Sequence, residues 1–125
     1  METTTDNLEK MANQLIDWCN QGDYDKAYQE LYSPNIVSIE AESNDELARV
    51  EGMEGIMKKG EWWEQNFEVH SSVASDPVVA DGYFTVKFTM DTTHKPSGQR
   101  AKSSEIGVYK VDNGKIVKET FFYKS

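Results

Sequence analysis

The sequence contains a single cysteine, Cys19, among its 125 residues. A lone cysteine cannot form a disulfide within the chain, and no group of cysteines has the short spacing that is typical of a metal site. The sequence therefore predicts a protein of a reducing compartment, which we take to be the cytoplasm. We expect it to need no metal ion and no other cofactor.

Basic residues and long apolar runs are also scarce. Thirteen basic residues stand against twenty-two acidic ones, which gives a formal net charge of −9. A negative field of this size repels phosphate backbones and anionic lipid headgroups. No apolar run approaches the roughly 20 residues that would span a bilayer, and the N-terminal residues lack the basic start and apolar stretch of a secretory signal. We expect neither nucleic acid nor a membrane as a partner.

The length and the pattern of the chain predict one domain over residues 1–125. A chain of this size can bury one hydrophobic core without disulfides or metals. No repeat or low-complexity segment suggests a second unit.

Two short helices are predicted first, as a hairpin. Apolar residues recur at three- and four-residue steps from Leu8 to Cys19. Asp6 is the expected N-cap of this helix, and Gly22 can take the left-handed conformation that ends it. Asp23 can then cap a second helix, whose apolar face lies within residues 24–31.

A third helical segment is predicted after Gly52. Met53, Ile56, Gly60 and Trp63 continue at helical spacing as far as Phe67. The charged residues of this segment are expected elsewhere, on its exposed surface: Lys58, Lys59, Glu61 and Glu64.

Strands dominate the rest of the chain. A short strand is predicted over residues 36–41, after the break at Ser33-Pro34-Asn35. From Val69 onward the period is two, most clearly over residues 83–90, where apolar and polar side chains alternate. Helices followed by sequential antiparallel strands indicate an α+β fold.

Turn signals divide these strands. Asp76-Pro77 and Asp81-Gly82 are typical turn pairs, and Asp112-Asn113-Gly114 joins two β-prone runs as a hairpin. Residues 42–46 and 91–100 read as the longer polar connections.

Three segments together resemble one known family. They are LIDWCNQGDYDKAYQELYSPNIVSI, VEGMEGI and DNGKIVKETFFY, in this order along nearly the whole chain. The chain is similar to the SnoaL-like and nuclear-transport-factor-2-like proteins, which include the ketosteroid-isomerase-like enzymes. The resemblance implies a cone-shaped, cystatin-like α+β roll in which three helical segments pack on a strongly curved antiparallel sheet. It also implies a pocket on the concave face of the sheet.

Glu119 is the first candidate for a catalytic residue. It is in phase with Phe121 and Tyr123 on the last predicted strand. A carboxylate among aromatic side chains is poorly solvated, which raises its pKa and suits a general acid or base near neutral pH. The alternative is an ordinary surface residue that faces a lysine on the neighbouring strand.

His70 and Glu40 are the other two candidates, and both remain open. His70 lies on the opposite face of its strand from Val69, and the sequence does not say which face is concave. Glu40 falls where the resemblance to ketosteroid isomerases places a proton-shuttling aspartate. Alternation argues the other way, since Val37 and Ile39 look like the buried face and would leave Glu40 outside.

Ten further residues are predicted to contact a ligand. Most follow from strand parity, on the assumption that Phe84, Val86 and Phe88 face the concavity, and the tryptophans could equally be core or subunit contacts. The set is Trp18, Tyr32, Trp63, Phe84, Val86, Phe88, Glu105, Tyr109, Phe121 and Tyr123.

Departures from known members of this fold narrow the expected activity. Leu15 stands where ketosteroid isomerases have their oxyanion tyrosine, and their companion acid maps near Gly107. Epoxide hydrolases of this fold need an Asp-Arg-Asp arrangement, but Arg49 and Arg100 are the only arginines and both lie near loops.

Two kinds of function remain. The first is a cofactor-free acid–base enzyme acting by cyclisation, isomerisation or dehydration on a small hydrophobic carbonyl or polyketide-like molecule. The second is a non-catalytic module that binds a ligand or a protein.

We also expect a homodimer that pairs through the sheet. The C-terminal strands are apolar on both faces, since Ile106 and Val108 oppose Tyr109 and Val111. One apolar face can pack on the helices, and the other needs cover.

Overall fold

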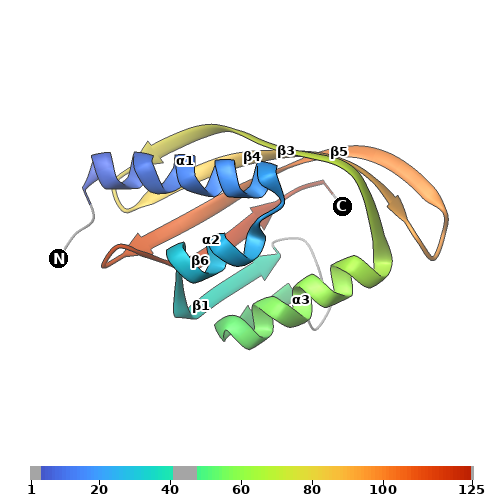
Figure 1. Ribbon diagram of the computed structural model, residues 1–125, viewed down its shortest axis with the longest axis horizontal. Helices are drawn as coiled ribbons and strands as arrows, with labels where there is room; N and C mark the ends of the chain where they lie inside the picture. The colour runs from blue at the N-terminus through green and yellow to red at the C-terminus, as the bar shows by residue number, and fades with distance from the viewer. Residues whose placement is uncertain (1–3, 41–47, 125) are drawn as a thin grey trace.

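The computed structural model describes residues 4–40 and 48–124. Within these ranges the chain forms three helices and a single six-stranded sheet, arranged as an α+β fold (Figure 1). The elements are α1 (Thr5–Gln21), α2 (Tyr24–Leu31), β1 (Tyr32–Glu40), β2 (Arg49–Glu51), α3 (Gly52–Asn66), β3 (Phe67–Ala80), β4 (Tyr83–His94), β5 (Gln99–Asp112) and β6 (Lys115–Phe122).

The sheet has the strand order β2-β1-β6-β5-β4-β3 and is strongly curved. Helix α1 packs against β3 and β4, whereas α3 packs against β1 (Figure 1). All neighbouring strands are antiparallel except β1 and β6, which are parallel. The predicted fold class is therefore confirmed, with one parallel pair that the sequence did not indicate.

The helical hairpin forms as predicted at its turn, but its first helix begins earlier. Gly22 adopts a φ of 75°, in the left-handed region, and Asp23 accepts a hydrogen bond from the Lys26 amide at 3.4 Å. Helix α1 begins at Thr5, and the Thr4 hydroxyl accepts from the Asn7 amide at 3.2 Å. The prediction of Asp6 as the N-cap is wrong, because Thr4 supplies the cap two residues earlier.

Three predicted interruptions of the sheet lie within strands instead. The predicted break at Ser33-Pro34-Asn35 falls inside β1, whose pairing with β6 shifts register between Tyr32 and Val37. Asp76-Pro77 lies inside β3, where Asp76 has a φ of 55° and the pairing with β4 shifts register between Ser75 and Val78. This is a β-bulge, which absorbs the extra residues without ending the strand. Most of residues 91–100 also pairs, since β4 runs to His94 and β5 starts at Gln99. The predicted connection at residues 42–46 lies outside the described residues.

A second bulge sets the phase of the last strand. The β5–β6 register shifts between Lys110 and Val111, so that Ile116 pairs with Val111 and is fully buried. Strict alternation from Glu119 would have placed Val117 in the core instead, but Val117 is only half-buried. At the start of β6 the bulge therefore turns Ile116 toward the core in place of Val117, while Glu119 still points inward.

The hydrophobic core lies between the helices and the inner face of the sheet. Its buried members come from every large element: Leu8, Met11, Ala12, Leu15, Ala27, Leu31, Tyr32, Ile36, Ile56, Ala74, Phe84, Val86, Tyr109, Val111 and Ile116. Across the described ranges, no helix is long and apolar enough to cross a bilayer.

Candidate functional site

A buried carboxyl group lies at the centre of the sheet. Glu119 on β6 is only 5% exposed, and it sits between Ser38 of β1 and Tyr109 of β5 in the strand register. The predicted inward direction of Glu119 is confirmed. A carboxyl group in this position must be hydrogen-bonded, because an unpaired buried polar group is costly.

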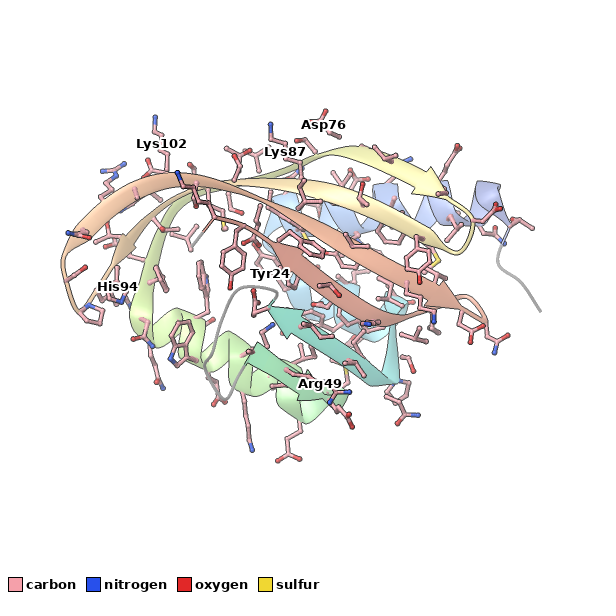
Figure 2. The ribbon with its side chains drawn as sticks, turned by 180° about the vertical axis from the view of Figure 1, so that it is seen from behind. Tyr24, Arg49, Asp76, Lys87, His94 and Lys102 are labelled. Atoms are coloured by element: carbon pink, nitrogen blue, oxygen red, sulfur yellow. The ribbon has the colours of Figure 1, made fainter. Side chains whose placement is uncertain are left out.

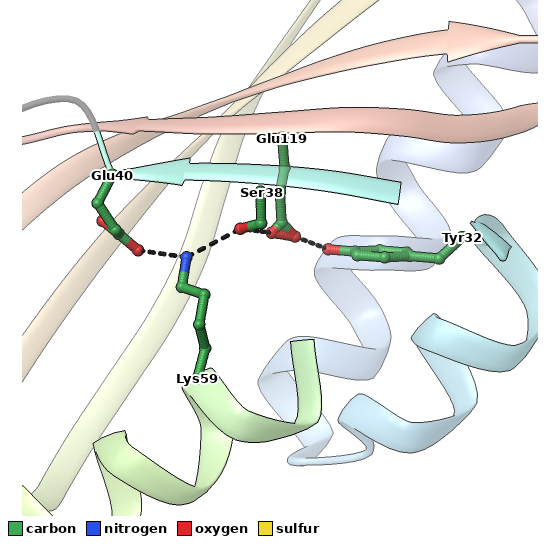
Figure 3. A network of polar contacts seen from close by, with 5 residues as sticks. All are labelled: Tyr32, Ser38, Glu40, Lys59 and Glu119. Atoms are coloured by element: carbon green, nitrogen blue, oxygen red, sulfur yellow. Dashed lines mark hydrogen bonds and ion pairs between the residues drawn. The ribbon is translucent and has the colours of Figure 1, made fainter. Parts of the chain in front are cut away.

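Both carboxyl oxygens of Glu119 have hydrogen-bond partners (Figure 3). The Tyr32 hydroxyl donates to Oε1 at 2.5 Å, and the Ser38 hydroxyl lies 3.3 Å from Oε2. Burial raises the pKa of Glu119, the nearby Glu40 raises it further, and the bonds from Tyr32 and Ser38 oppose the shift. Desolvation is the largest of these effects, so Glu119 holds a proton more tightly than an ordinary glutamate.

Lys59 extends this arrangement toward solvent. Its Nζ donates to the Ser38 Oγ at 2.8 Å and to the Glu40 Oε1 at 2.8 Å (Figure 3). The same ammonium lies 5.4 Å from the centre of the Phe121 ring, within the range of a cation–π contact. We call Tyr32, Ser38, Glu40, Lys59 and Glu119 the Glu119 network.

The network has one buried end and one end that solvent can reach. The Tyr32 and Glu119 residues are at most 7% exposed, whereas the side chains of Lys59 and Glu40 are 17% and 23% exposed. A molecule that approaches from solvent would therefore meet Glu40 and Lys59 before Glu119.

The inward direction of Glu40 corrects the alternation argument for β1. Ser38 is fully buried, and Val37 and Ile39 are only half-buried. The parallel pairing places Ser38 beside Glu119 and Glu40 beside Phe121 on β6, so these polar residues share the inner face. The position inferred from the ketosteroid-isomerase resemblance was the better guide.

The sequence pattern predicted Lys59 on the exposed surface of the third helix, and that prediction is wrong. Lys59 follows Ile56 by three residues and precedes Trp63 by four, so it lies on the same stripe of α3 as these apolar side chains. A lysine in phase with a buried stripe was the available signal. Its long apolar stem can lie along the core while the ammonium reaches a polar partner.

His70 does not join the site. The β3–β4 register shifts between Val69 and Ser71, which leaves His70 at a bulge with an exposed side chain. Its Nε2 lies 2.7 Å from the Thr93 hydroxyl. The sequence left the face of His70 open, and the structure places this candidate at the surface, where the bulge and the contact with Thr93 hold it.

Three of the predicted ligand contacts pack the core instead. Phe84 and Val86 have no exposed surface, and Tyr109 is 2% exposed and stacks on Phe84 with ring centres 4.9 Å apart. These three side chains point inward, as predicted. Other side chains already cover them, so the prediction that they contact a ligand is wrong.

The tryptophans lie apart from the Glu119 network. Trp18 packs against the core, with the Lys26 ammonium 5.6 Å from its ring. Trp63 stacks on Phe67 at 4.3 Å, and Phe67 in turn lies 5.1 Å from the His94 ring. Neither tryptophan is hydrogen-bonded to the Glu119 network among the described residues.

Four further residues of the predicted ligand-contact set are half-buried. Phe88 and Phe121 meet edge to face with ring centres 6.3 Å apart, and Glu105 is the cross-strand partner of Phe88. Tyr123, also half-buried, follows the last residue of β6.

Gly107 leaves room for the rings of Tyr109 and Phe88. A methyl group at Gly107 would come within 2.9 Å of the Tyr109 ring and 3.1 Å of the Phe88 ring. The site therefore cannot hold a carboxyl side chain at this position, near which the ketosteroid-isomerase companion acid was mapped.

No metal site is evident. Within residues 4–40 and 48–124, no three His, Cys, Asp or Glu side chains gather as a metal ion would require. Burial and the nearby Glu119 raise the pKa of the Cys19 thiol to about 12, which disfavours the thiolate at neutral pH.

Comparisons with known proteins agree with the fold. Residues 4–123 match the family model of the SnoaL-like domain. A SnoaL-like polyketide cyclase candidate from Mesorhizobium loti is 34% identical, with 92% of this chain and 97% of that one covered at a TM-score of 0.85. A search of the curated proteins finds no significant match.

More distant structures share the fold alone. An NTF2-like protein of unknown function from Burkholderia pseudomallei has a TM-score of 0.76 at 13% identity, covering 94% of this chain and 91% of its own. A protein with a cystatin-like fold from Xanthomonas campestris also has a TM-score of 0.76, at 17% identity, covering 95% and 92%. The matched region and the fold together show that the chain belongs to the SnoaL-like domain family.

Proposed function

We propose that the protein is an enzyme that carries out cofactor-free acid–base chemistry on a small hydrophobic carbonyl compound. The observation that carries this proposal is the Glu119 network, in which hydrogen bonds connect a buried carboxyl group to the partly exposed Glu40. Its reaction would be a cyclisation, an isomerisation or a dehydration, each of which requires a proton to move. The name of the Mesorhizobium loti relative, a polyketide cyclase candidate, supports the same class.

Glu40 is the group best placed to take a proton from the substrate. It lies at the end of the network that solvent reaches, and Lys59 holds its Oε1 in an ion pair. A positioned carboxylate can remove a proton from the carbon next to a carbonyl group, and the electron pair then moves onto the carbonyl oxygen.

Lys59 supplies the charge that this step needs. An ammonium group has three N–H donors, and Ser38 and Glu40 accept from two of them. The third N–H can donate to the carbonyl oxygen as negative charge develops there. Lys59 would then replace the donors that Leu15 and Gly107 cannot provide.

Glu119 acts behind these two residues. Its oxygens are engaged by Tyr32 and Ser38, so it does not touch the substrate directly. Because Ser38 bonds both Glu119 and Lys59, the protonation state of Glu119 changes the charge felt at the open end. Glu119 is a positioning residue that sets the electrostatics of Glu40 and Lys59.

Proton exchange with D₂O tests this function without knowledge of the substrate. A panel of cyclic ketones and 1,3-diketones is incubated with the protein in D₂O, and loss of the proton next to the carbonyl is followed by NMR. The unchanged protein is expected to accelerate exchange for at least one member. Glu40→Gln should slow it by roughly 100-fold or more, the usual contribution of a general base.

A matched control separates this effect from a change in net charge. Glu54, an exposed residue in the first turn of α3, is changed to Gln and should leave the rate unaltered. Ketones that bind, as seen by chemical-shift changes, without any exchange would reject the enzyme and support the non-catalytic binding module.

We also propose that the protein is a cytoplasmic homodimer. On the outer face of the sheet, Val78, Ile106 and Phe122 are 63%, 50% and 49% exposed, and they line a groove of about 480 Å³. Asp76 and Lys87 also line it and point away from α3 (Figure 2). A second copy related by a two-fold axis could place Lys87 against Asp76 of the other chain while covering the apolar surface.

A further inference from the structure

Glu105 is a carboxyl group near the Glu119 network that makes no hydrogen bond or ion pair with the described residues. It lies on β5, on the same face as Tyr109 and opposite Phe88 of β4. It is half-buried, and among the described residues it makes no hydrogen bond and no ion pair. By contrast, Glu40 has an ion pair and Glu119 has two hydrogen bonds.

The charged groups around Glu105 come from three elements. Glu40 of β1 lies beside Phe121 of β6, which pairs with Gly107, two residues from Glu105 on the same face of β5. Among the described residues that shift the pKa of Glu105, Glu40 and Glu119 are negative and Lys59 of α3 is positive. Burial raises the pKa of Glu105 to about 7; Glu40 and Glu119 add to this rise, and Lys59 opposes it. Three carboxyl groups thus share one ammonium group, whose ion pair is already formed with Glu40.

We propose that Glu105 is the general acid of this site, returning a proton to the substrate after Glu40 has removed one. The step rests on the function proposed above and adds its second catalytic residue. Two carboxyl groups in different surroundings divide the roles of acid and base, because one is stabilised as a carboxylate and the other keeps its proton.

The two transfers balance for an isomerisation. Glu40 takes a proton from the carbon next to the carbonyl, and the C–H electron pair forms the enolate double bond while Lys59 donates to the oxygen. The enolate electrons then form a new C–H bond with the proton of Glu105 at the far end of the conjugated system. Glu40 ends protonated and Glu105 ends ionised, and exchange with solvent resets both.

The first test measures the proton on Glu105 directly. The protein is labelled with ¹³C at the glutamate side-chain carboxyl groups and titrated by NMR, and the Glu105 signal is assigned by its loss in Glu105→Gln. A midpoint near 7 is expected. A midpoint near 4.5, the ordinary value for a glutamate, would overturn the inference, because the group would carry no proton to donate at neutral pH.

The second test uses the pH dependence of turnover. With a β,γ-unsaturated cyclic ketone as the probe, the rate of double-bond migration in the unchanged protein should fall as pH rises above about 7, since Glu105 must be protonated. In Glu105→Gln the rate should be at least ~100-fold lower, without that fall. Glu68 is an exposed residue on β3. The control variant Glu68→Gln should keep the pH–rate profile of the unchanged protein.

The outcomes separate the two proposals. If the unchanged protein exchanges no proton with any ketone of the panel, the acid–base function fails, and the role of Glu105 fails with it. If it does exchange protons but Glu105→Gln keeps the rate and the fall above pH 7, only the assignment of Glu105 is wrong. A merely structural role would lower the rate at every pH and leave the fall in place.

Discussion

Tyr32 and Glu119 are 87 positions apart in the sequence, yet the Tyr32 hydroxyl donates to the Glu119 Oε1 at 2.5 Å. Tyr32 is the first residue of β1, and Glu119 lies within the parallel partner strand β6. This bond fixes the buried end of the Glu119 network, and it counters part of the rise that burial causes in the pKa of Glu119.

Tyr32→Phe should therefore destabilise the fold and raise the pKa of Glu119 further. The change leaves Oε1 without its donor inside the core, which costs about 1–3 kcal/mol in the free energy of unfolding. Urea unfolding gives the stability, and ¹³C NMR of the labelled carboxyl groups gives the pKa. Tyr83→Phe, at an exposed tyrosine, is the control. Equal stability for both variants would contradict a role for the Tyr32 bond.

Lys59→Met should slow proton exchange by roughly 100- to 1,000-fold for any ketone of the panel on which the unchanged protein acts. Removal of one hydrogen-bond donor to a developing oxyanion has an effect of this size. Methionine keeps most of the apolar stem but removes the ammonium. Lys58→Met removes the same charge from the exposed neighbour and is expected to leave the rate unchanged. A similar loss in both variants would point to net charge instead.

The same variant should also move the titration of Glu105. Lys59 lowers the pKa of Glu105, so its removal is expected to raise that pKa above about 7. The Glu105 signal in the ¹³C titration measures this. An unchanged midpoint in Lys59→Met would show that the two groups do not interact.

Stability should depend on pH through Glu105. Its pKa rises from 4.5 to about 7 on folding, so the folded state binds the proton more tightly than the unfolded state. The resulting stabilisation is complete below about pH 4.5 and is lost as pH rises to about 7. Relative to Glu105→Gln, the unchanged protein should lose up to about 3 kcal/mol in unfolding free energy over this window.

Urea unfolding of both proteins at pH 5 and pH 8 measures that difference, and Glu68→Gln again serves as the control. A difference between the unchanged protein and Glu105→Gln that stays constant from pH 5 to pH 8 would show that the group is not perturbed by folding.

The outer face of the sheet should mediate dimer formation. Light scattering at micromolar concentration is expected to give twice the mass of the chain. Ile106→Asp or Phe122→Asp should yield a monomer, because either variant would bury a carboxylate at the contact. Met57→Asp, on an equally exposed apolar residue of α3, should remain a dimer. A monomeric unchanged protein would reject the proposed interface.

The sequence by itself determined the helical hairpin and the α+β class, and it gave the inward direction of Glu119 as one of two alternatives. These features depend on local periodicity and on turn chemistry, such as the left-handed Gly22 and the cap at Asp23. Local patterns are sufficient where each face of an element has one consistent environment. The alternation of β4, with Phe84 and Val86 inward, is of the same kind.

Only the tertiary structure decided how the candidate site is assembled. β-bulges in β3 and in the β5–β6 pair changed which side chains face the helices. As a result, His70 is exposed and Ile116 is buried in the core. A bulge is set by pairing with the neighbouring strand, so no pattern within one strand reveals it. The parallel contact of β1 with β6 likewise brought Ser38 next to Glu119, and the packing of α3 on β1 carried Lys59 to both strands. These contacts join residues far apart in the chain, which is why the site emerges from the fold and not from any one segment.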